Sequence, residues 1–176
     1  MIKLCYDPEK NRDLSIFLAN LGLVYAENNQ LDKAASYYLQ SIELKRKVNG
    51  GRPDYGMLQG LKILGVTCYK NNNLKEAVQY WEEFFSLSHQ LEGNAVTSEI
   101  AAILLCLASS YDGLKNLQEA KNKAELALSA YRELSGNQPC PNQKNCLTLL
   151  QSIYQRLSNH QQAKECAQEL QSYAQS

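Results

Sequence analysis

The chain has 176 residues, of which 18 are acidic and 18 basic, so its formal net charge is zero. A chain without a basic excess lacks the electrostatic footprint that nucleic acid requires, so we expect no nucleic-acid partner. It holds no apolar run long enough to cross a bilayer, and residues 1–14 form no hydrophobic signal segment, so we expect no membrane partner.

One alanine position recurs through the whole chain with a constant period. It returns every 43 residues, as Ala34, Ala77, Ala120 and Ala163. A fixed period of about 20 to 50 residues is typical of stacked repeats. Leu18, Leu21 and Tyr25 share one helical face, and Ala34 and Tyr38 share a face of the next helix. The sequence therefore predicts an all-α solenoid of helix-turn-helix repeats that forms a right-handed superhelical arc.

The register of the pattern places four repeats within a single domain, residues 1–176. Their approximate bounds are 11–50, 54–93, 97–136 and 141–176. In the same register, residues 1–10 match the end of a preceding repeat, with its connection over residues 7–13. Such a start would leave an apolar N-terminal edge open to self-association, formed by Leu4, Cys5, Ile16 and Phe17.

Residues between the repeating faces predict how the helices begin and end. An asparagine followed three residues later by Glu or Gln predicts capping boxes at Asn73, Asn116 and Asn159. Glycines that follow the second helices predict left-handed stops at Gly50, Gly93 and Gly136. Pro141 falls where a proline can open the first helix of the fourth repeat.

These residues resemble the tetratricopeptide repeat. In that family Leu-Gly and then Tyr mark the first helix, and Ala followed by a large aromatic residue marks the second. Leu21, Gly22 and Tyr25 match this pattern in the first repeat. The third and fourth repeats depart from it, with Ala124 and Ala167 at the aromatic position. The length of 43 residues, with an Arg-Pro-Asp exit loop, resembles the long repeats of kinesin light chains.

The resemblance implies a scaffold that binds a peptide or helix of a partner protein on a concave face lined by the first helices. The stripe of each first helix beside its core face would provide the partner-binding residues, and we expect Asn20, Leu23, Glu27, Gln59, Lys62, Val66, Tyr69, Lys70, Leu105, Ser109, Asp112, Asn145, Ser152 and Arg156. Lys62, Tyr69 and Lys70 would form a cationic, aromatic wall for an acidic and apolar segment.

Two other functions stay open beside the peptide scaffold. The chain could be a structural or oligomerisation segment of a longer repeat protein, or a sensor array that regulates an absent effector domain. Its two histidines, His89 and His160, fall at unrelated register positions, and zinc needs three or four converging ligands. We therefore expect no metal, no cofactor and no enzyme activity. The six cysteines follow no pairing pattern, which favours free thiols and a cytoplasmic location.

Overall fold

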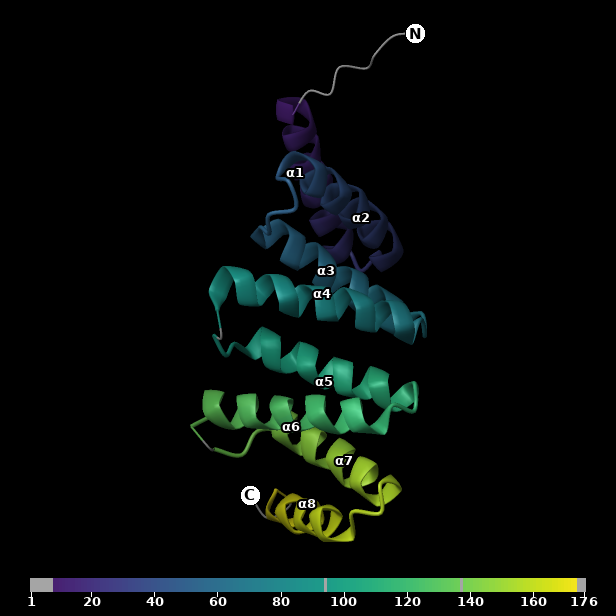
Figure 1. Cartoon of the computed structure of the whole chain (residues 1–176), viewed down its shortest axis with the longest axis vertical. Helices are drawn as coiled ribbons and strands as arrows, with labels where there is room; N and C mark the ends of the chain where they lie inside the picture. The colour runs from purple at the N-terminus through teal and green to yellow at the C-terminus, as the bar shows by residue number, and fades with distance from the viewer. Residues whose placement is uncertain (1–7, 94, 137, 174–176) are drawn as a thin grey trace. The chain divides into compact units, whose positions relative to one another are not determined.

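The structure is a computed structural model that describes residues 8–93, 95–136 and 138–173. Over these ranges the chain forms eight helices and no strand. The helices are α1 (Pro8–Glu27), α2 (Leu31–Val48), α3 (Tyr55–Lys70), α4 (Leu74–Glu92), α5 (Ser98–Gly113), α6 (Leu117–Leu134), α7 (Pro141–Arg156) and α8 (His160–Ser172). Short turns join the two helices of each repeat into a hairpin (Figure 1). The predicted all-α repeat fold is confirmed.

The helices divide into two compact units between Gly93 and Asn94. We call the unit with α1–α4 the first unit and the unit with α5–α8 the second. In the first, α2 packs against both α1 and α3, and in the second, α6 packs against both α5 and α7. The first helices of neighbouring repeats also touch, α1 with α3 and α5 with α7. Within each unit one hairpin thus stacks on the other, as in a solenoid. The single domain and the right-handed arc stay predictions.

The core of every hairpin comes from the positions that recur along the sequence. The second helices bury the recurring alanines, Ala34, Ala77, Ala120 and Ala163. The first helices bury a recurring leucine, at Leu18, Leu61, Leu104 and Leu147. Because the distance between packed helices depends on the side chains at their contact, a buried alanine allows close approach. The predicted core faces are confirmed at these positions, whereas Leu21 and Tyr25 of the first repeat are only half-buried.

In the first two repeats an aromatic ring packs on a glycine of the facing helix. A Cβ atom on Gly22 would lie 3.0 Å from the ring of Tyr38, and one on Gly65 would lie 2.2 Å from Trp81 Nε1. Both rings are almost completely buried. The glycines are therefore required by the rings that cover them, and not by backbone conformation.

Each first helix ends in a left-handed turn that leads directly into the second helix. A residue with positive φ holds the same register position in all four repeats, at Asn29, Asn72, Lys115 and Ser158. In the first repeat, the amide of Asn29 donates to the carbonyl of Ala26 over 3.0 Å, and that of Gln30 to the carbonyl of Tyr25 over 2.9 Å. The same two bonds recur in the other repeats and form a Schellman motif. Residue types alone do not predict this turn, because lysine and serine rarely adopt the left-handed conformation.

The predicted asparagine capping boxes are wrong at two of their three positions. Asn116 accepts a hydrogen bond from the amide of Glu119 over 3.4 Å, whereas the side chains of Asn73 and Asn159 make no capping bond. All three asparagines have ψ angles of 65° to 74°, set by the turn that precedes them, and only the Asn116 side chain still reaches an amide. The extended backbone that aims a capping side chain at the helix start is found instead at Asp54, with ψ 162°.

The predicted glycine stops and proline start are confirmed. Gly50, Gly93 and Gly136 have φ values of 61°, 66° and 59°, a left-handed conformation that costs glycine little because it has no Cβ atom. Pro141 is the first residue of α7. The side-chain oxygen of Gln143 accepts a hydrogen bond from the amide of Cys140 over 3.1 Å at this helix start.

The connection predicted over residues 7–13 is wrong for residues 8–13, which already belong to α1. Pro8 is the first residue of this helix, where the missing amide proton of proline removes no hydrogen bond. Glu9 adds a carboxylate in the first turn, which the helix dipole stabilises. Leu4 and Cys5, which the sequence placed on the N-terminal edge, lie outside the described residues.

Candidate functional site

In the first unit, the predicted partner-binding stripe lies on α1 and α3. Asn20, Leu23 and Glu27 are exposed on α1. On α3 the chain exposes Tyr69 and Lys70 and half-buries Gln59, Lys62 and Val66. Because α1 and α3 contact each other, these residues belong to one side-by-side pair of first helices.

Tyr69 is the predicted residue that the fold positions most firmly. Its ring centroid lies 5.8 Å from that of Trp81, at an interplanar angle of 43°. Trp81 is buried, while Tyr69 keeps 39% of its surface exposed. One edge of the Tyr69 ring is thus held against the core and the rest faces outward, next to Lys70.

In the second unit, the structure brings two of the predicted residues together and leaves the others apart. Arg156 of α7 forms an ion pair with Asp112 of α5. Both residues were predicted to bind a partner, whereas in the structure each partly neutralises the charge of the other. The other predicted residues on these helices are half-buried, Leu105 and Ser109, or exposed, Asn145 and Ser152.

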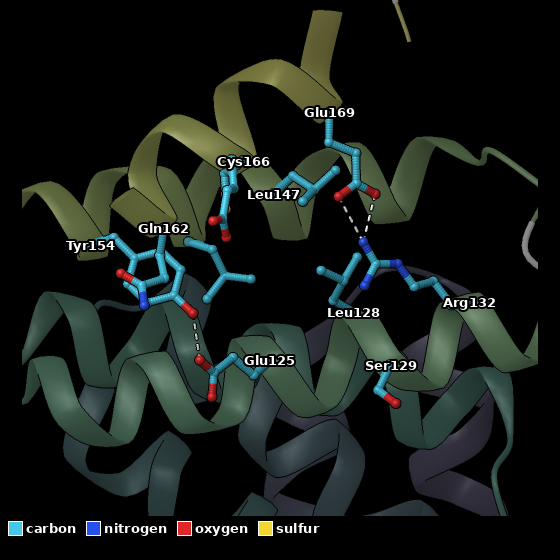
Figure 2. Close-up of a pocket in the computed structure, with 11 residues that line it drawn as sticks. Glu125, Leu128, Ser129, Arg132, Leu147, Tyr154, Gln162, Cys166 and Glu169 are labelled. Atoms are coloured by element: carbon cyan, nitrogen blue, oxygen red, sulfur yellow. Dashed lines mark hydrogen bonds and ion pairs between the residues drawn. The ribbon is translucent and has the colours of Figure 1, made fainter. Parts of the chain in front are cut away.

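A cavity of about 330 Å³ lies on a different face of the second unit, between α6, α7 and α8. Its lining residues are Glu125, Leu128, Ser129, Arg132, Leu147, Leu150, Tyr154, Gln162, Glu165, Cys166 and Glu169. None of the predicted stripe residues contributes to it. The two second helices, α6 and α8, form its walls, and α7 contributes leucines and a tyrosine between them (Figure 2).

Two polar contacts lie at opposite ends of this cavity. Arg132 of α6 donates two hydrogen bonds to the carboxylate of Glu169 on α8, over 2.6 and 2.7 Å. At the other end the hydroxyl of Tyr154 donates to Glu125 over 2.5 Å. Figure 2 shows leucine side chains between the two contacts. The cavity therefore has an apolar middle and charged ends.

Burial and nearby carboxylates raise the pKa values of two titratable groups in the cavity, Tyr154 and Cys166. Burial raises the pKa of the Tyr154 hydroxyl, and so do its hydrogen bond to Glu125 and the charge of that carboxylate. The pKa of the Cys166 thiol is raised by burial first and then by Glu169 and Glu165, against the opposing charge of Arg132. Both groups are thus held in their neutral forms at neutral pH.

One register position in the lining of the cavity carries a smaller side chain than its equivalent in the second repeat. Cys166 occupies in the fourth repeat the position that Tyr80 holds in the second. Burial raises the pKa of Tyr80, and Cys68, Glu76 and Glu83 raise it further, so its side chain lies among them. The sequence contained this signal, a Tyr-to-Cys change at a repeating position, but periodicity alone does not show that the space stays unfilled.

The described part of the chain contains neither a group of three potential metal ligands nor a helix that is long and apolar enough to span a membrane. Cys140 and Cys146, the only cysteines that lie close together in the sequence, both have free thiols.

Comparison with solved structures identifies the class of protein that this fold defines. BtubC (BKLC) from P. vanneervenii superimposes with a TM-score of 0.72 at 20% identity, over 97% of this chain and 66% of that chain. TPR-like repeats of a putative kinesin light chain from Podosopora anserina give a TM-score of 0.66 at 19% identity, over 90% of this chain and 73% of that one. The apo form of RapI gives 0.68 at 14% identity, over 91% of this chain and 42% of its own.

At such identities the likeness shows the fold, which is that of a helical-repeat solenoid. This chain spans less than two thirds of BtubC and of RapI. Residues 17–48 match the tetratricopeptide repeat family by sequence, and no curated protein matches the chain. The chain therefore contains a tetratricopeptide repeat match at residues 17–48, within a helical-repeat fold similar to that of kinesin-light-chain-like repeats.

Proposed function

We propose that the chain is a protein-interaction scaffold that binds a peptide or helix of a partner along its first helices, on the predicted concave face. The observation that carries this proposal is the position of the Tyr69 ring, which contacts the buried Trp81 on one side and is exposed on the other. A fixed, amphipathic ring provides contact area at a small cost in conformational entropy.

The charges near Tyr69 indicate what kind of segment would bind. Lys62 and Lys70 lie on the same helix, eight residues and so about 12 Å apart along its axis. A partner segment with an acidic residue next to a large apolar one would meet both the lysines and the ring. Glu27 on the neighbouring α1 opposes such a ligand, so we expect micromolar affinity, about −8 kcal/mol at most.

The test begins with selection of peptides from a random library on the whole chain, followed by calorimetric titration. We expect Lys62→Glu/Lys70→Glu to weaken the selected acidic peptides at least about tenfold at low salt, a loss of about 1.4 kcal/mol, without lowering the melting temperature. Lys75→Glu/Lys164→Glu is the matched control, since it makes the same charge change on exposed positions of second helices. Equal binding by all three proteins would overturn the assignment.

A second candidate function, self-association through the outer face of α1, has an observation of its own. Leu14, Phe17 and Val24 are 46%, 60% and 52% exposed. Their register equivalents on α3 are the buried residues Met57, Gly60 and Thr67, and those on α7 are the buried residues Gln143, Cys146 and Ile153. In α3 and α7 the face is covered by the second helix of the preceding repeat, so on α1 a second copy of the chain would cover it.

Sedimentation equilibrium over a wide concentration range tests this second function. We expect reversible dimers, and we expect Phe17→Glu to make the chain monomeric while its helix content stays the same. The control is Ile16→Glu. The sequence placed Ile16 on the same edge as Phe17, but its register equivalents Gln59 and Asn145 are not buried, so it lies outside the face that is covered in other repeats. A wild-type chain that stays monomeric at every concentration would exclude the second function and leave the first intact.

A further inference from the structure

We propose that the cavity between α6, α7 and α8 is a second binding site, which takes a lysine or arginine side chain of a partner polypeptide together with an adjacent apolar residue. The site is separate from the first-helix stripe and shares with the proposed function only the assumption that the partner is a polypeptide.

The size of the cavity sets the class of ligand. Its volume of about 330 Å³ is at the small end of the range for ligand pockets, about 300 to 1,000 Å³. Such a space fits one long side chain and part of its neighbour better than a whole cofactor. Leu128, Leu147 and Leu150 give it an apolar middle, which suits the aliphatic stem of a lysine or arginine.

Charge selects a cation. The lining contains three carboxylates, from Glu125, Glu165 and Glu169, and one guanidinium, from Arg132, which gives a formal charge of −2. Arg132 is paired with Glu169 at one end of the cavity. The hydrogen bonds that Glu125 and Glu165 accept from Tyr154 and Gln161 come from neutral groups and leave the carboxylate charges in place.

The arrangement of the charges also orients the ligand. At one end of the cavity the charge of Arg132 is balanced by Glu169, and Figure 2 shows Glu125 at the far end beside Tyr154 and Gln162. A basic side chain would therefore place its charged group toward Glu125 and Glu165, away from Arg132, and its stem across Leu150 and Cys166. Desolvation by the leucines strengthens a charge-assisted hydrogen bond to these carboxylates.

The experiment uses the whole chain and three short probes that differ in one residue. The peptides acetyl-Leu-Arg-Leu-amide, acetyl-Leu-Gln-Leu-amide and acetyl-Leu-Glu-Leu-amide are titrated into the labelled protein and followed by amide chemical shifts. We expect the arginine peptide to shift residues of α6, α7 and α8 around the cavity, and the glutamine and glutamate peptides to leave them unchanged. Equal shifts with arginine and glutamine, shifts confined to other surfaces, or none at the solubility limit would overturn the proposal.

Variants of the chain then locate the site. Cys166→Tyr introduces the side chain that the second repeat carries at this position, and we expect it to weaken the arginine peptide at least about tenfold. Cys166→Ser keeps the space and should bind as the wild type does. If Cys166→Tyr does not fold, Glu125→Gln/Glu165→Gln removes the charge without adding volume and should weaken binding to the same degree. Unchanged affinity in the charge variant contradicts the proposal.

The two proposals can fail independently. Lys62→Glu/Lys70→Glu, which tests the first-helix stripe, should leave the arginine peptide bound as in the wild type. Loss of its binding in this variant would assign the peptide to the stripe and overturn the cavity site.

Discussion

The two units of the chain pack the first helix of each hairpin against the second with different side chains. In the first unit, second-helix rings such as Trp81 pack against a glycine of the first helix. In the second unit, alanines take the ring positions, and the glycine positions carry larger residues, Ala108 and Gln151. The same repeat register therefore accepts either a ring facing a glycine or an alanine facing a larger residue, provided that the residues on the two facing helices change together.

The second unit also differs from the first around the cavity between α6, α7 and α8. Cys166 replaces Tyr80 of the second repeat and Tyr154 replaces Cys68, yet a space remains between α6, α7 and α8. The charged contact above this space is kept, because Arg46 with Glu83 and Arg132 with Glu169 occupy the same register in the two units. The two units thus keep the same ion pair above different side chains, with Cys68 and Tyr80 in the first unit and Tyr154 and Cys166 in the second.

The largest expected effect is the loss of the ring that fills the first unit. Trp81→Ala should lower the free energy of unfolding by about 3 to 5 kcal/mol, since it removes a large side chain that is fully buried and leaves a cavity. Urea unfolding followed by circular dichroism measures this, because the variant lacks the only tryptophan. Ala124→Gly, at the same register in the second unit, should cost about 1 kcal/mol. Equal losses at both sites would contradict the comparison.

The next effect tests whether the two facing positions are coupled. Gly65→Ala should cost about 1 to 3 kcal/mol, because its Cβ atom would lie 2.2 Å from Trp81 Nε1. In the Trp81→Ala background the same change should cost nothing or stabilise the chain, since alanine at both positions reproduces the pair found at Ala108 and Ala124. A double-mutant cycle measures the coupling, and additive losses would show that the two positions are independent.

Gly22→Ala provides a graded control for this cycle. Its Cβ atom would lie 3.0 Å from the ring of Tyr38, a contact that a small shift of the ring relieves. We expect a smaller loss of stability than at Gly65, and a larger one would mean that the close approach of the ring does not determine the cost of the substitution.

Much of the fold could be predicted from the sequence, because the four hairpins are built in the same way. Positions such as Leu61 and Ala77 are buried in their own repeat for the reason that applies to their equivalents. Interactions that join different repeats were harder to predict. Asp112 and Arg156 lie on the predicted stripe, but their ion pair depends on how α5 crosses α7, which periodicity does not contain.

The candidate site was predictable only in part, for a similar reason. Tyr69 and Lys70 were expected on an open first-helix face and are exposed there, whereas the cavity was missed. A cavity depends on space that neighbouring side chains leave unfilled, so it requires the volumes of α6, α7 and α8 together. The change from Tyr80 to Cys166 was visible in the register, but its consequence was not.

A smaller effect should distinguish the two units at alkaline pH. In the second unit, burial raises the pKa of Cys146 and of Tyr131 to about 12, in each case with a further contribution from neighbouring cysteines. A raised pKa stabilises the fold fully below the unfolded value, about 9 for a thiol and 10 for tyrosine. That stabilisation is lost as the pH rises toward about 12.

Two spectroscopic signals can separate the units during an alkaline titration. Trp81 fluorescence reports on the first unit, and circular dichroism reports on both. We expect helix content to fall at a lower pH than the Trp81 fluorescence changes. Cys146→Ala should move this first loss of helix content to higher pH, once the loss is expressed relative to the stability of the same variant at neutral pH. A first loss that appears in Trp81 fluorescence would contradict the assignment of the alkaline sensitivity to the second unit.

The smallest effect concerns the ion pairs that the two units share. Arg132 and Glu169 keep 41% and 36% of their side-chain surfaces exposed, and Arg46 and Glu83 keep 44% and 33%. Pairs this exposed are screened by water and salt, so Arg132→Met and Arg46→Met should each cost only about 0 to 1 kcal/mol, with methionine preserving most of the aliphatic packing. Urea unfolding at low and high salt measures both variants, and the small difference from the wild type should vanish at high salt. Arg132→Met could instead cost clearly more than Arg46→Met at high salt. The ion pair beside the cavity would then contribute packing that the pair beside Tyr80 does not, and the shape of the cavity would depend on Arg132 as well as on Cys166.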